Sequence, residues 1–112
     1  MKTKTVIYWL ITLLLVGCGT RQAGENGSEP QEITVFAASS LIDAFTELAE
    51  AFEEQNEGVA IILNFAGSSQ LAAQLSEGVP ADVFAPANPA QMQAVVDAGR
   101  IEAGSEKLFV SN

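Results

Sequence analysis

The stretch Ile33-Thr34-Val35-Phe36-Ala37-Ala38-Ser39-Ser40-Leu41 decides the fold of this chain. Its first six residues form a short apolar run with β-branched members, which is typical of a strand buried on both faces in a parallel sheet. Two serines end the run, and a helical pattern follows them directly. The stretch therefore predicts a strand, a tight turn and a helix, with the serine pair at the turn.

A second stretch further along the chain repeats this design. Val59 to Phe65 reads as another apolar strand, interrupted only by Asn64. The sequence Phe65-Ala66-Gly67-Ser68-Ser69-Gln70-Leu71 then leads from this strand into a helix. We expect two strand-serine-helix units in succession.

Apolar residues at helical spacing predict the helices that follow these turns. The predicted first helix has its apolar residues at Leu41, Phe45, Leu48 and Phe52. It ends at Asn56 to Gly58. The predicted second helix has its apolar residues at Leu71, Ala72 and Leu75, and it stops at Gly78. The acids between the first set, at positions 47, 50, 53 and 54, are expected on a solvated helix face.

The rest of the chain continues the alternation of strands and helices. Asp82 to Ala85 predicts a third strand, and Asn88-Pro89 predicts a helix start with a cap followed by proline. The buried stripe of that helix, which ends at Ala98-Gly99, is expected to be Met92, Val95 and Val96. Leu108 to Val110 predicts the beginning of another strand. This order favours a three-layer α/β domain with a mostly parallel sheet. Because the chain stops one strand into its next unit, we expect it to be truncated.

The N-terminus has the three parts of a secretory signal. Lys2 and Lys4 precede an apolar core, Val6 to Val16, which is shorter than the roughly 20 residues of a membrane span. The segment closes with Leu15-Val16-Gly17-Cys18, which resembles the bacterial lipobox, in which the cysteine is lipidated. We therefore expect a lipoprotein signal peptide at 1–17, a flexible linker at 18–31 and an incomplete folded domain at 32–112. The alternative is an uncleaved anchor with an incidental cysteine.

Composition excludes several classes of function. The 112 residues carry a formal net charge of −9 and contain no histidine. In residues 18–112 only three basic residues remain against all 14 acids, which makes the net charge −11. A nucleic-acid surface is not expected at this charge, and the absence of histidine removes Ser/His/Asp triads and imidazole zinc sites. With 48% hydrophobic and 17% charged residues, the chain is expected to fold into a packed body.

The serine pairs carry the chemistry that the sequence suggests. Ligands of open α/β sheets bind beyond the carboxyl ends of the strands, where both pairs are expected to lie. The first turn of a helix leaves main-chain N–H groups without partners, so serine hydroxyls beside them form a site for an oxyanion. The alternative is that Ser40 and Ser68 only cap their helices, and Ser40 with Asp43 matches the capping-box spacing. Asp82 is expected to be structural rather than catalytic, because no base, nucleophile or metal partner accompanies it.

Three stretches in this order resemble the molybdate-binding proteins of bacterial ABC importers. They are the two serine stretches and Gly78-Val79-Pro80-Ala81-Asp82-Val83-Phe84. The resemblance implies the first part of a two-lobed periplasmic binding protein of type II, which closes on its ligand by a hinge. It also implies that Ser40 and Ser68 bind oxyanion oxygens, with Ser39, Gly67 and Ser69 as further candidates. The loop Ala85-Pro86-Ala87-Asn88 departs from the family, which often has a serine and an acid there.

The resemblance implies a monomeric, extracytoplasmic lipoprotein that is not an enzyme. It would hold no cofactor and no directly bound metal, would capture molybdate or tungstate, and would deliver it to an ABC permease. Two alternatives stay open: a site for sulfate or phosphate, and a truncated lipoprotein remnant without ligand.

Overall fold

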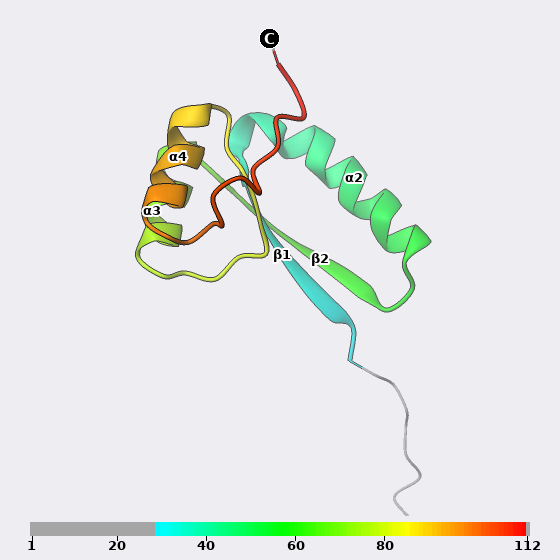
Figure 1. Ribbon diagram of the computed structural model, residues 1–112. Coiled ribbons are helices and arrows are strands. Elements are labelled where there is room, and N and C mark those ends of the chain that lie inside the picture. Colours follow the sequence, from blue (N-terminus) through cyan, green and yellow to red (C-terminus); the bar gives the residue numbers. More distant parts are fainter. Residues whose placement is uncertain (1–28, 112) are drawn as a thin grey trace, which may run out of the picture.

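The computed structural model describes residues 29–111, which form a sheet of parallel strands between helices (Figure 1). The elements are β1 (Gln31–Ala38), the 3-10 turn η1 (Ser39–Leu41), α2 (Ile42–Gln55), β2 (Val59–Ala66), α3 (Ser68–Ser76), β3 (Val83–Ala85) and α4 (Pro89–Asp97). The strand order is β2-β1-β3, and both pairings are parallel. The predicted α/β fold is confirmed.

The central strand β1 pairs along its whole length with β2, from Gln31 opposite Val59 to Ala38 opposite Ala66. On its other side, β1 pairs with the short β3 over Val35 to Ala37. The first residue of β1, Gln31, was assigned to the linker in the sequence. It belongs to the sheet, where its N–H donates to the Gly58 carbonyl at 2.8 Å.

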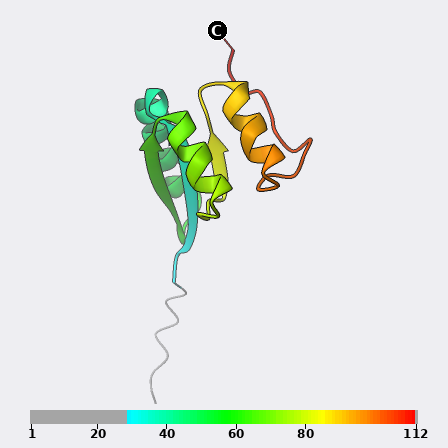
Figure 2. The ribbon, with the colours of Figure 1, turned by 90° about the vertical axis from the view of Figure 1, so that its left-hand side faces the viewer.

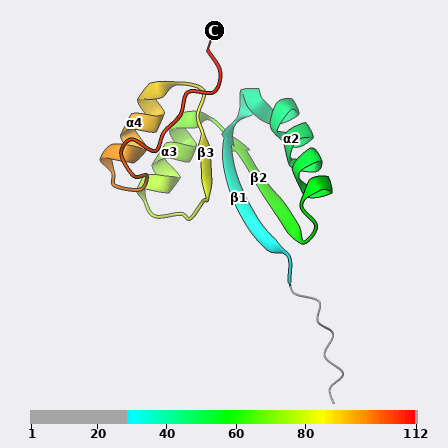
Figure 3. The same ribbon diagram turned by 45° about the vertical axis from the view of Figure 1, so that its right-hand side comes forward.

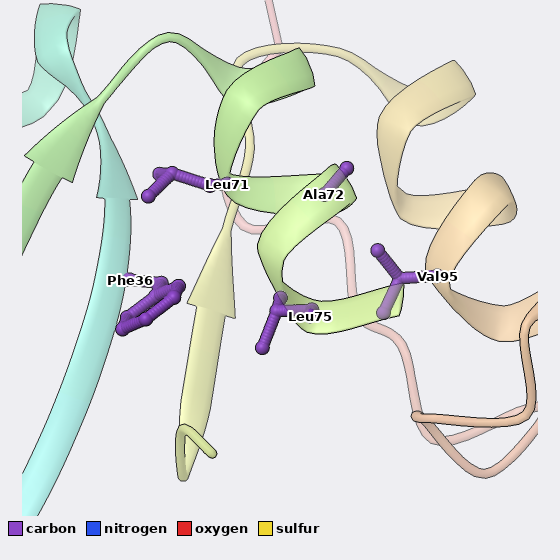
Figure 4. Packing of buried hydrophobic residues seen from close by; sticks show 5 residues of the cluster. All are labelled: Phe36, Leu71, Ala72, Leu75 and Val95. Carbon is purple, nitrogen blue, oxygen red and sulfur yellow. The ribbon is translucent and has the colours of Figure 1, made fainter. Parts of the chain in front are cut away.

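Helices cover both faces of the sheet, with α2 on one side and α3 and α4 on the other (Figure 3). On the α3 side, Phe36 of β1 forms one buried cluster with Leu71, Ala72 and Leu75 of α3 and Val95 of α4, in which Leu71 and Leu75 point toward Phe36 and Ala72 points toward α4 (Figure 4). On the α2 side, the buried residues are Val35, Ala37 and Ala85. Because β1 is buried on both faces, its run of apolar residues is continuous rather than alternating.

The apolar stripe of α2 differs from the prediction. Leu48 and Phe52 are 61% and 45% exposed, and the half-buried positions of α2 are Phe45, Thr46, Ala49 and Glu53. The helix is therefore rotated relative to the predicted stripe. Glu53 does not lie on a solvated face, because its carboxylate accepts a hydrogen bond from the main-chain N–H of Ile61. This bond from α2 occupies a main-chain donor of the outer strand β2.

Glycine ends both α3 and α4 in the same way. Gly78 has φ +104° and Gly99 has φ +70°, a left-handed conformation that costs glycine little. Beyond each glycine, the next N–H bonds back into the last turn, from Val79 to Gln74 and from Arg100 to Val95. These are Schellman motifs, and they confirm the helix ends predicted at Gly78 and at Ala98-Gly99.

The strand predicted at Leu108 to Val110 is wrong. Within residues 29–111 this segment pairs with no strand, and its three side chains are 62–81% exposed. An apolar run becomes a strand only where a neighbouring backbone accepts its hydrogen bonds, and local sequence does not reveal that neighbour. Phe109 instead contacts α2, with its ring edge toward Phe45 at 6.2 Å between centroids. No helix among the described residues has the length and apolar character to cross a bilayer.

Candidate functional site

Both serine turns leave the sheet at the same edge. Ala38 and Ala66 are the last register pair of β1 and β2, so Ser39 and Gly67 follow from neighbouring strand ends about 4.8 Å apart. The strand β3 runs in the same direction, so the loop at 86–88 leaves from this edge too (Figure 2). We call this set of three loop segments the carboxyl edge: residues 39–40, 67–69 and 86–88.

Strand order makes this edge a place where a ligand can bind. In the order 2-1-3, the connection from β1 runs to one side and the connection from β2 crosses to the other. In open α/β sheets ligands bind where such connections diverge, which in this sheet is next to the end of β1. Although α2 and α3 lie on opposite faces, their N-terminal ends both face this edge.

The first serine turn is not a helix cap. Ser39 and Ser40 are exposed and form η1, and the N-cap of α2 is Leu41. Neither η1 nor α2 has a side-chain capping bond, so the alternative interpretation, a capping box of Ser40 with Asp43, is wrong. The 3-10 turn moves the helix start beyond Ser40, which leaves the hydroxyl without the N–H groups that a cap would bind.

The second serine turn is not a side-chain cap either. Gly67 is the N-cap of α3, and Ser68 is its first helical residue. The hydroxyl oxygen of Ser68 accepts a hydrogen bond from the main-chain N–H of Ala87 at 2.9 Å. Leu71 makes the first bond of the helix, to the Gly67 carbonyl at 3.0 Å. Among the described residues, the N–H groups at positions 68–70 have no acceptor, so donors remain available at this helix start.

The contact with Ala87 adds a loop that the sequence left in doubt. Ser69 is exposed, whereas Ser68 is half-buried because the loop after β3 lies against it. Nothing in the local pattern of Ala85-Pro86-Ala87-Asn88 points to this role, because the bond uses a main-chain group that every residue except proline carries. The turn at Ser68 follows β2 and the loop follows β3, so parallel pairing of both strands with β1 brings the two to the same edge.

The helix α4 provides a contrast at the same edge. Asn88 is its N-cap, and the side-chain oxygen accepts from the Gln91 N–H at 3.1 Å, with Pro89 at the first helical position. This is the helix start that the sequence predicts. Of the three helices that begin at the carboxyl edge, α4 therefore has a side-chain N-cap, while α2 and α3 have none.

Gly67 occupies a position where the fold does not demand glycine. Its φ is −62°, which any residue adopts, and a Cβ built there meets no atom of the described residues within 4 Å. Open space lies above this backbone. A ligand can therefore approach the chain closely at this point.

Asp82 lies far from this edge, at the opposite end of β3. Its carboxylate accepts from the Thr34 N–H, and its own N–H donates to the Thr34 carbonyl. Asp82 and Ala87 are five positions apart on either side of β3, a separation of up to roughly 16 Å. These bonds agree with the structural role that the sequence predicts for Asp82. A shallow hollow of about 270 Å³ beside Asp82 and Arg100 also lies at this far end, away from the serines.

Comparison with known proteins agrees with the motifs. A family model described as bacterial extracellular solute-binding protein matches residues 33–112. The molybdate-binding protein ModA of Mycobacterium tuberculosis is 45% identical over 102 residues, which cover 88% of this chain and 39% of the relative. ModA of Escherichia coli is 37% identical over 90 residues, covering 80% and 35%. YvgL of Bacillus subtilis, assigned as an ABC transporter substrate-binding lipoprotein, is 30% identical over 100 residues, covering 89% and 38%.

A solved structure shows the same fold. A substrate-binding domain assigned to a molybdenum ABC transporter of Clostridium difficile superposes with a TM-score of 0.57 at 29% identity, covering 59% of this chain and 29% of that domain. The chain spans about two fifths of the length of the curated relatives that it matches. The resemblance to molybdate-binding proteins is confirmed, and through residues 33–112 the chain belongs to the family of bacterial extracellular solute-binding proteins.

Proposed function

We propose that this chain is part of a solute-binding protein that captures molybdate, or the similar tungstate, and delivers it to an ABC permease. The oxyanion would contact Ser40 and Ser68 through their hydroxyl and N–H groups, with Ser39, Gly67 and Ser69 beside them. The observation that carries this proposal is the pair of helix starts without side-chain caps at one sheet edge. Relatives of 45% and 37% identity whose names record molybdate binding support the choice of ligand.

The acidity of the chain does not oppose this function. A unit charge about 20 Å away in water acts on an anion with roughly 0.2 kcal/mol before salt screening. A hydrogen bond to a charged group contributes about 1.5 to 3 kcal/mol. Several direct bonds from hydroxyls, N–H groups and helix dipoles therefore outweigh the distant acids, and no cationic side chain is needed.

The same proposal places the protein outside the cytoplasm as a lipoprotein. Family membership agrees with an extracytoplasmic location. The signal peptide at 1–17, lipidation of Cys18 and the linker 18–31 remain predictions, because residues 1–28 lie outside the described part of the chain. Acyl chains on Cys18 would anchor the protein, since stable attachment takes two or more of them. The lipoprotein assignment of YvgL supports this arrangement.

Capture of the ion would involve more than these residues. The relatives continue well beyond the matched region, so we propose that a second lobe completes the cleft and closes on the ligand by a hinge. The carboxyl edge would supply the contacts from the first lobe. Transport proteins of this kind bind and release a solute without chemical change.

Calorimetry on the full-length gene product, meaning the whole reading frame that contains this chain, tests the proposal. We expect molybdate to bind tightly and an excess of sulfate not to displace it, because the size of the closed cleft and a fixed set of donors would discriminate between the two ions. Equal affinity for sulfate would rule out molybdate as the specific ligand and favour a general oxyanion carrier. Absence of binding by any oxyanion would favour a ligand-free lipoprotein remnant.

A further inference from the structure

The two serines of the carboxyl edge differ in what holds their hydroxyls. The Ser40 side chain is exposed and forms no hydrogen bond with another described residue. Ser68 is half-buried, and its oxygen accepts from the Ala87 N–H at 2.9 Å. A serine hydroxyl has one proton and two lone pairs. Because Ala87 occupies one lone pair, the proton of Ser68 must point away from Ala87.

This arrangement prepares Ser68 to donate. A hydroxyl that already accepts a hydrogen bond is polarised and donates more strongly. The bond also restricts rotation of the hydroxyl, so less freedom is lost when a ligand binds. The free N–H groups at positions 68–70 are donors as well, so the whole start of α3 presents donors to one place.

From this geometry we infer that Ala87 is a positioning residue of the oxyanion site. Its main-chain N–H orients the Ser68 hydroxyl toward the bound ion, and its side chain has no part in the contact. The inference rests on the proposed function and adds the loop after β3 to the site. It also accounts for the departure of Ala85-Pro86-Ala87-Asn88 from the family pattern, because any residue except proline at position 87 supplies this N–H.

A double-mutant cycle on the full-length gene product tests the inference, with calorimetric titration of molybdate. S68A is expected to weaken binding about tenfold or more, because it removes a donor to a charged ligand. A87P removes the N–H, although its ring also fixes φ and lies toward Ser68, and it is expected to weaken binding about three- to tenfold. The double variant should bind like S68A alone, since Ala87 acts through the hydroxyl. A87G, which keeps the N–H, and S76A at the far end of α3 serve as matched controls and should bind like the wild type.

Two results would overturn the inference alone while molybdate still binds the wild type. The first is a double variant whose fold-loss of molybdate affinity equals the product of the losses in A87P and S68A. The second is a loss of affinity in A87G as large as that in A87P. If A87P does not fold, amide exchange decides: the Ala87 N–H should exchange faster in S68A than in the wild type, and equal rates would exclude the bond. A wild-type protein that binds no oxyanion would instead overturn the proposed function.

Discussion

Thr34 and Asp82 exchange two hydrogen bonds where β3 joins the sheet. The Asp82 N–H donates to the Thr34 carbonyl at 2.8 Å, and the Thr34 N–H donates to the Asp82 carboxylate at 2.8 Å. The side chain thus takes the place of a main-chain acceptor at the start of a strand only three residues long. A short edge strand gains a fixed register from this pair.

Replacing Asp82 should therefore affect stability and not binding. D82A leaves the Thr34 N–H without its protein acceptor, and we expect a loss of about 1 kcal/mol in the free energy of unfolding, since water reaches this exposed site. D82N keeps an acceptor and should lose less than half as much. Urea unfolding measures both, and molybdate affinity should stay within twofold of the wild type. A large loss of affinity in D82N would show that the carboxylate serves the ligand.

The absence of a side-chain cap at α2 predicts the behaviour of Ser40. S40A should change the free energy of unfolding by less than about 0.5 kcal/mol, because the hydroxyl bonds no helix N–H. If Ser40 binds the oxyanion, the same variant should weaken molybdate binding about tenfold or more. Denaturant unfolding and calorimetry separate the two effects. A destabilised variant with normal affinity would restore the capping interpretation.

Asn88 should show the opposite profile. Its side chain caps α4, so N88A is expected to lower the free energy of unfolding by about 1 kcal/mol. For a domain of this size that corresponds to a melting temperature about 5 °C lower. N88S and N88D retain an acceptor and should remain close to the wild type. Thermal unfolding gives the comparison, and equal stability of N88A and N88S would argue against the cap.

Gly67 offers a test that separates space for the ligand from the needs of the fold. The backbone at 67 accepts alanine without strain, and the added Cβ meets open space, so G67A should cost less than about 1 kcal/mol of stability. A bound ion close to this backbone would meet the methyl group, and affinity should fall at least severalfold. Calorimetry on a variant shown to be folded gives the answer. Unchanged affinity would place the ion away from Gly67.

Local sequence determined much of this protein. The continuous apolar run of β1 indicates a strand buried on both faces, and the glycines at 78 and 99 end their helices as expected. Asn88-Pro89 gave a correct helix start. These features depend on residues close together along the chain, where backbone sterics, missing N–H groups and apolar spacing act directly. Three motifs in order were sufficient to indicate the family as well.

Tertiary structure alone decided the remaining features, because they depend on partners distant in sequence. The rotation of α2 follows from how the helix packs on the sheet, and it gives Glu53 a main-chain partner eight residues away at the β2 edge. Leu108 to Val110 has strand composition but no neighbouring backbone to pair with among the described residues. The hydrogen bond between Ser68 and Ala87 needs β2 and β3 on either side of β1. Its donor is a main-chain N–H, which leaves no mark in the sequence.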